Sequence, residues 1–86
     1  MKIYSIPIEV VALSNEKYPT PLRVRINLKG KLTVIKIYKV VEVIEEKYCG
    51  NRMLRYVCQG IDDNNKTIQL ELKFDIENTT WLLWKL

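Results

Sequence analysis

The sequence predicts one small all-β domain over residues 1–86, either a strongly bent antiparallel meander or an SH3-like barrel of roughly five to six strands. The first observation behind this prediction is an unbroken alternation of apolar and polar residues from Thr67 to Glu77. A period of two is typical of a half-buried strand with one wet face, because successive side chains point to opposite faces of a sheet. The second observation is a series of turn signals that divides the chain into strand-length segments, near Gly30, Gly50, Asp63 and Asn78.

Two strands are predicted before the first of these turns. Residues 2–13 place Ile6, Ile8 and Val10 on one face, and Pro7 indicates an edge position or a bulge because proline has no backbone N–H. Residues 14–21 form a loop by their turn-forming composition. Residues 22–29 alternate again, and Gly30 supplies the positive φ of a tight hairpin. The apolar face of this second strand comprises Leu22, Val24, Ile26 and Leu28, and its polar face comprises Arg23, Arg25, Asn27 and Lys29.

Residues 31–48 allow two interpretations. Residues 32–37 are strand-like. Residues 39–48 could continue this strand or form a short helix, because a helix would bring Val40, Val41, Ile44 and Tyr48 together on one apolar face. We favour a strand because Val and Ile are poor helix formers and no N-cap residue precedes the segment. With Gly50 and Asn51 as a two-residue hairpin loop, the predicted cross-strand pairs are Glu46 with Arg55, Ile44 with Val57, and Val43 with Cys58.

This hairpin predicts two reduced cysteines. Cys49 would lie at the turn, and Cys58 would lie on the order of 20 Å away along the return strand, at ~3.3 Å per residue. A disulfide requires Cα atoms within about 7 Å of each other.

The last third of the chain completes the meander. Residues 52–61 form the return strand, residues 62–66 a turn, residues 67–77 the alternating strand and residues 78–80 a last turn. Residues 81–86 form the final strand. The predicted core comprises Val24, Ile26, Leu70, Leu72, Phe74 and one of the two tryptophans.

Composition argues against an enzyme. The chain has no His, and its only serines are Ser5 and Ser14, so no nucleophile with a partner base is evident. Two cysteines cannot complete a zinc site alone. We therefore expect no catalytic residues, no metal and no cofactor. No apolar run approaches the ~20 residues of a membrane helix, and no signal peptide is evident, so we expect a cytoplasmic protein that does not bind a membrane.

Basic residues concentrate between residues 22 and 39, a stretch without any acidic residue. On paired strands they would form one positive face beside an aromatic side chain, as in small β-barrels that bind nucleic acid. The candidate nucleic-acid site comprises Arg23, Arg25, Lys29, Lys31, Lys36 and Tyr38. A simpler interpretation is that these cations keep a small protein soluble and protect its strand edges.

The C-terminal segment is apolar on both faces, with Trp81 and Leu83 on one and Leu82, Trp84 and Leu86 on the other. Either this strand is central in a closed barrel, or its outer face contacts a partner through Leu82, Trp84 and Leu86. We therefore predict a non-catalytic interaction module that binds a protein or associates with itself as a homodimer. Nucleic-acid binding by the basic face of residues 22–39 is the alternative.

Five short segments lie between residues 20 and 86: Leu22-Arg23-Val24-Arg25, Gly30-Lys31 leading into Val34 and Ile37, Val40-Val41-Glu42, Arg55-Tyr56 and Trp81-x-Leu83. Through these segments the chain resembles small uncharacterised bacterial all-β domain proteins. The resemblance implies a small β-domain and implies no activity.

Overall fold

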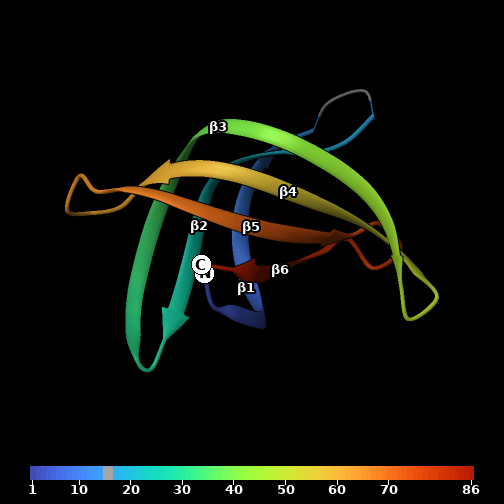
Figure 1. The fold of residues 1–86 in the computed structure, drawn as a ribbon, viewed down its shortest axis with the longest axis horizontal. Coiled ribbons are helices and arrows are strands. Elements are labelled where there is room, and N and C mark those ends of the chain that lie inside the picture. The colour runs from blue at the N-terminus through green and yellow to red at the C-terminus, as the bar shows by residue number, and fades with distance from the viewer. Residues whose placement is uncertain (15–16) are drawn as a thin grey trace.

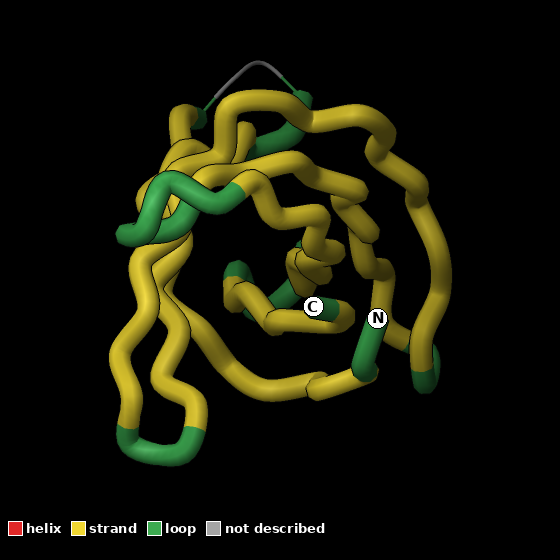
Figure 2. The backbone as a smooth tube through the Cα atoms, turned by 60° about the vertical axis from the view of Figure 1, so that its left-hand side comes forward, coloured by secondary structure: helices red, strands yellow, loops and turns green. Residues whose placement is uncertain are grey.

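The computed structural model describes residues 1–14 and 17–86, and these form six antiparallel strands that close into a barrel (Figure 1). The strands are β1 (Ile3–Leu13), β2 (Thr20–Leu28), β3 (Lys31–Tyr48), β4 (Asn51–Ile61), β5 (Thr67–Asp75) and β6 (Thr80–Lys85). Each strand pairs with the next along the chain, and β6 pairs with β1 to close the barrel (Figure 2). The all-β prediction is thereby confirmed.

Both chain ends lie at the closure between β1 and β6. The backbone N–H of Lys2 donates to the carbonyl of Leu86 at 2.9 Å, and the N–H of Leu86 donates back at 3.0 Å. Pro7 lies in the part of β1 that pairs with β6, whereas the pairing of β1 with β2 begins at Glu9. One side of the strand at Pro7 is therefore an edge in the described structure, as predicted for a residue without a backbone N–H.

Residues 39–48 are part of the long strand β3, so the alternative of a short helix is wrong. Two irregularities interrupt the pairing of β3 with β4, between Ile37 and Lys39 and between Val40 and Glu42. Each leaves one residue of β3 without a partner, which bends the strand and increases its twist. The bend lets β3 pair first with β2 and then with β4 (Figure 1). No described residue belongs to a helix that is long and apolar enough to cross a membrane.

The predicted register of the β3–β4 hairpin is wrong by two positions. Cys49 and Gly50 form the two-residue loop, with φ of 50° and 84°. The two-residue turns whose twist matches that of the strands need a positive φ at both central residues. Glycine is preferred at the second central position, which Gly50 occupies here. The observed pairs are Glu46 with Met53, Ile44 with Arg55 and Val43 with Tyr56.

The predicted core is confirmed. Val24, Ile26, Leu70 and Leu72 are fully buried, and Phe74 and Trp81 pack against them with ring centroids 4.8 Å apart. Further buried residues complete it: Ile35, Leu54, Tyr56, Cys58 and Leu83.

Leu22 departs from the predicted apolar face, because its residue is 45% exposed. Val11 lies opposite Arg23, and Ala12 lies opposite Pro21, so Leu22 is the extra residue of a bulge. Pro21 takes the buried position instead. Of the predicted loop at residues 14–21, residues 15 and 16 lie outside the described residues, and Thr20 and Pro21 belong to β2.

Both cysteines are free, as predicted, with Cys49 exposed at the hairpin loop and Cys58 buried in the core. Burial raises the pKa of the Cys58 thiol to about 12, so this thiol stays protonated near neutral pH.

The outer face of β5 was predicted to be wet, and this prediction is wrong for three residues in the second half of the strand. Glu71, Lys73 and Asp75 are only 8%, 5% and 8% exposed. Charged side chains of neighbouring strands, together with Trp84, cover this face. The Lys73 ammonium lies 3.8 Å from the centre of the Trp84 ring.

Candidate functional site

Three cations of the predicted site share the outer face of β2 and β3. Arg23 lies directly opposite Lys36, and Arg25 lies opposite Val34. These residues point outward because the alternating residues Val24, Ile26 and Ile35 are fully buried. We call Arg23, Arg25, Lys36 and Tyr38 the basic face.

Tyr38 lies at the bend of β3, two residues beyond Lys36. It is the extra residue of the irregularity between Ile37 and Lys39, and it is 54% exposed. Its hydroxyl donates a hydrogen bond to Oε1 of Gln59 at 3.3 Å. This contact directs the ring along the outer surface, while leaving much of the ring accessible to a stacking partner.

Lys29 and Lys31 do not join the basic face. Lys29 belongs to the β2–β3 hairpin turn, with φ of 52°, and Lys31 pairs with Leu28 to close that turn. By the alternation of β3, Lys31 shares the side of Ile35 and not that of Lys36. Both lysines are exposed at the tip of the hairpin.

The charges of the basic face are poorly neutralised by the rest of the described chain. Among the residues that the structure describes, its one ion pair joins Nη1 of Arg25 to Oε2 of Glu9 at 3.9 Å, between two largely exposed side chains. An exposed pair of this length contributes little to stability. Arg23 and Lys36 form no ion pair with any described residue, so this part of the surface keeps its positive charge.

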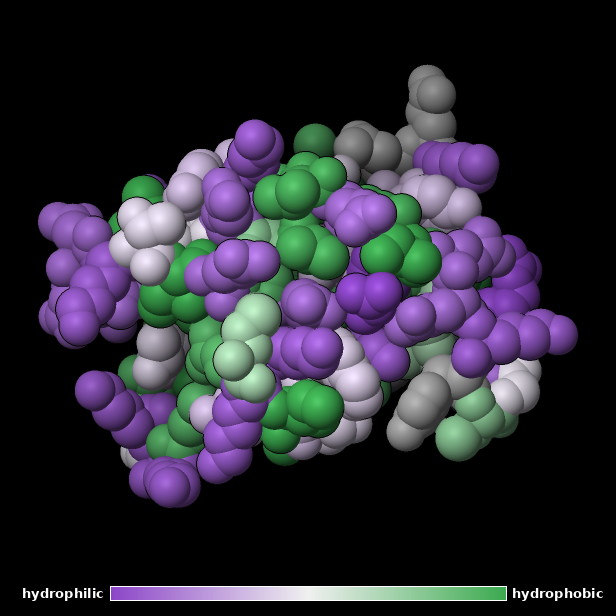
Figure 3. Space-filling model, viewed as in Figure 1, coloured by the Kyte–Doolittle hydropathy of each residue, from purple (hydrophilic) through white to green (hydrophobic). Residues whose placement is uncertain are grey.

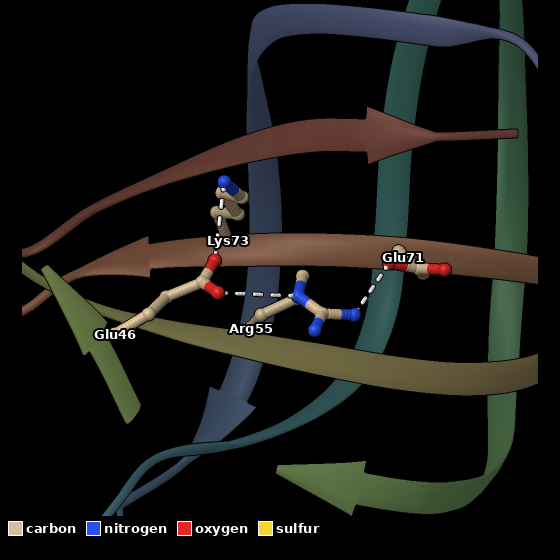
Figure 4. A network of polar contacts seen from close by, with 4 residues as sticks. All are labelled: Glu46, Arg55, Glu71 and Lys73. Carbon is tan, nitrogen blue, oxygen red and sulfur yellow. Dashed lines mark hydrogen bonds and ion pairs between the residues drawn. The ribbon is translucent and has the colours of Figure 1, made fainter. Parts of the chain in front are cut away.

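Charges on the other side of the barrel are paired instead (Figure 4). Arg55 contacts Glu71 at 3.0 Å and Glu46 at 3.5 Å, and the Lys73 ammonium contacts Glu46 at 3.1 Å. The hydrogen bond to Glu71 raises the pKa of Arg55 above its ordinary value. We interpret this cluster as structural, because its acidic and basic groups satisfy one another. In Figure 3, which looks onto β4 and β5, hydrophilic side chains cross the centre and apolar ones form separate groups.

A shallow hollow of 430 Å³ adjoins the basic face on the outside of β1, β2 and β3. Arg23 and Arg25 form part of its wall, together with Glu9, Val10, Val11, Leu32 and Val34. A second hollow of 470 Å³ shares Glu9, Arg25 and Leu32 with the first and continues towards Pro7 and Asn27. Sequence reasoning missed this groove. The sequence does contain a signal for it, because Leu32, Val34 and Lys36 are spaced two residues apart. This spacing puts two apolar residues on the same side of the strand as the cations.

The predicted apolar face at the C-terminus is not one surface. Leu82 points outward beside Lys73, and Trp84 packs under Lys73, while Leu86 packs against the core. The pairing of β6 with β5 shifts between Leu83 and Lys85, so Trp84 is an extra residue that breaks the alternation. All three side chains are partly buried, because β6 has neighbours on both edges.

In the part of the chain that the structure describes, no cluster of His, Cys, Asp and Glu could hold a metal ion. Comparison with known proteins gives no match to a family model, to a curated protein or to a solved structure.

Proposed function

We propose that this chain is a non-catalytic binding module that holds single-stranded nucleic acid against its basic face. The main support is the side-by-side position of Arg23 and Lys36, two outward cations without an ion pair among the described residues. Arg25 follows two residues along β2, so the three cations form a short bent line, with one step along β2 and one step across to β3.

Such a line suits a phosphodiester backbone. Phosphates release condensed counterions when Lys and Arg neutralise them, and this release supplies most of the sequence-independent affinity. Proteins that bind single strands add aromatic side chains on which bases stack. Tyr38 stands at the end of the line and offers such a ring.

The salt dependence of binding tests this function. With about three phosphate contacts, from Arg23, Arg25 and Lys36, the plot of log affinity against log salt should have a slope of roughly −2. Fluorescence anisotropy of a labelled oligothymidylate between about 50 and 200 mM salt measures this slope.

The variant Arg23→Ala/Lys36→Ala removes two contacts and should flatten the slope by about 1.4 units. Its matched control is Lys47→Ala/Lys66→Ala, which removes the same charge from exposed positions outside the basic face. Equal effects of the two variants would show that only net charge matters, and would contradict a defined site.

A second candidate function, self-association, is favoured by the edge of β3 that β2 leaves without strand pairing. Its pairing with β2 ends at Lys36, and among the described residues no strand covers that edge beyond this point. Val41 and Val43 of this segment are exposed. An unpaired edge is a template for another strand, and an identical copy related by a two-fold axis supplies one. Sedimentation over a range of concentrations tests this candidate, and a strict monomer rules it out.

A further inference from the structure

We infer that the hollow beside the basic face holds an unstacked nucleobase, an inference that rests on the proposed function and specifies what the site recognises. The ligand would then be a single strand with accessible bases and not a duplex or an arbitrary polyanion.

The lining of the hollow carries this inference. Phosphate contacts alone need only cations, yet three apolar residues also line the hollow, with Val11 on the β1 side of the two arginines and Leu32 and Val34 on the β3 side. Val11 and Leu32 are 60% and 49% exposed, so an apolar side chain faces solvent on each side of the arginines. Exposed apolar groups with a charged rim are typical of binding sites.

The charges around the hollow separate a base from a phosphate. Glu9 lies on β1 opposite Arg25 and pairs with it at 3.9 Å, so these two charges partly cancel, whereas Arg23 lies on β2 opposite Lys36 and has no ion pair among the described residues. A phosphate is therefore favoured over Arg23 and Lys36, and less so in the part of the hollow where Glu9 pairs with Arg25. A neutral, flat base is not repelled there, and guanidinium planes are surfaces on which RNA-binding proteins stack bases.

The size of the hollow is compatible with this ligand. Its 430 Å³ falls within the range of about 300–1,000 Å³ that is usual for small-molecule sites. The neighbouring hollow shares Leu32 and Arg25, so the strand can continue towards Asn27 without leaving the groove.

The test compares two probes that differ only in their bases. One is a short fluorescein-labelled oligothymidylate, and the other is an abasic phosphodiester strand of the same length. The intact protein is expected to bind the base-bearing strand about tenfold more tightly, the size of one good stacking contact.

Leu32→Ser should remove most of this ratio and leave the affinity for the abasic strand unchanged. Leu13→Ser is the matched control, because Leu13 is equally exposed on a strand but does not line the hollow. Val11→Ser is a second variant within the hollow, which decides the outcome if Leu32→Ser does not fold.

Equal affinity of the intact protein for both probes would overturn the inference and leave nucleic-acid backbone binding standing. The same holds if folded Leu32→Ser and Val11→Ser both keep the preference for bases. Absence of binding to either probe at about 50 mM salt would overturn the proposed function and the inference together.

Discussion

Gly60 is the residue whose substitution by alanine should damage the barrel most for the smallest chemical change. It lies on β4 opposite Ile37, where β3 begins to bend. A Cβ atom at this position would lie 2.5 Å from Cγ2 of Ile35 and 2.7 Å from the backbone oxygen of Lys36. Glycine within a strand often marks such a close approach of another backbone.

The expected cost follows from these contacts. The Ile35 side chain could shift, but the Lys36 oxygen belongs to β3, so the methyl group can be accommodated only if the two strands separate. Overpacking of this kind costs typically 1–3 kcal/mol, and we expect the upper end, about 3 kcal/mol, because a backbone must move. A domain of 86 residues has a total free energy of unfolding of about 4–13 kcal/mol, so Gly60→Ala would remove a large part of it.

Urea denaturation followed by tryptophan fluorescence measures this loss. Trp81 packs on Phe74 and on Tyr56, with ring centroids 4.8 and 5.2 Å apart, and therefore reports the opening of the core. The matched control is Gly50→Ala, where a Cβ atom would meet nothing within 4 Å and only the positive φ of 84° is strained. That strain costs roughly 1–2 kcal/mol. If Gly60→Ala is no more destabilising than Gly50→Ala, this result contradicts the inference that β3 and β4 lie too close together at Gly60 to admit a Cβ atom.

Three further predictions concern single side chains. Hydrogen bonds from Asn78 lower the pKa of Asp75 in the folded protein. The Asp75 carboxylate therefore stabilises the fold above the unfolded pKa near 4, and this contribution is lost as the pH falls through the lower folded pKa. Asp75→Asn should flatten the acid denaturation curve in that range, and an unchanged curve would contradict the assignment. Cys49→Asn should stabilise the protein by about 0.5 kcal/mol in urea denaturation, because asparagine tolerates φ of 50° better than cysteine, and a loss of stability would argue against this turn. Glu9→Gln should raise the affinity for single-stranded DNA about twofold at low salt, because it removes an anion near Arg25, whereas a lower affinity would mean that Glu9 contacts the ligand favourably.

The sequence was sufficient for the strands and for most of the core. The alternation at residues 67–77 assigned Leu70 and Leu72 to the interior, where both are fully buried. The hairpin register could not be decided, because Cys49-Gly50 and Gly50-Asn51 are both acceptable loop dipeptides. The error was two positions, which changes the partners but preserves the face of every side chain.

Long-range contacts account for what the sequence did not reveal. The outer face of β5 is covered because Trp84 and Arg55 reach it from other strands, and no local pattern reports that arrangement. The bulges at Leu22 and Trp84 have the same origin, since they depend on how neighbouring strands fit together.

The basic face was partly predictable. The alternation of residues 22–29 correctly puts Arg23 and Arg25 on one side of β2, and their pairing then brings Lys36 beside them. Charge alone could not separate Lys31, whose position on β3 gives it the opposite side, nor could it reveal the apolar hollow.

The central claim is that single-stranded nucleic acid binds the outer face of β2 and β3, and mapping of amide chemical shifts on the labelled protein tests it most directly. Titration with a short oligothymidylate should shift the amide signals of residues 23–25 and 32–38, with those of residues 9–11 beside the hollow. Signals of β5 and β6, on the far side of the paired charges, should stay in place. Shifts confined to β4, β5 or β6, or no shifts at saturating oligonucleotide, would contradict the claim.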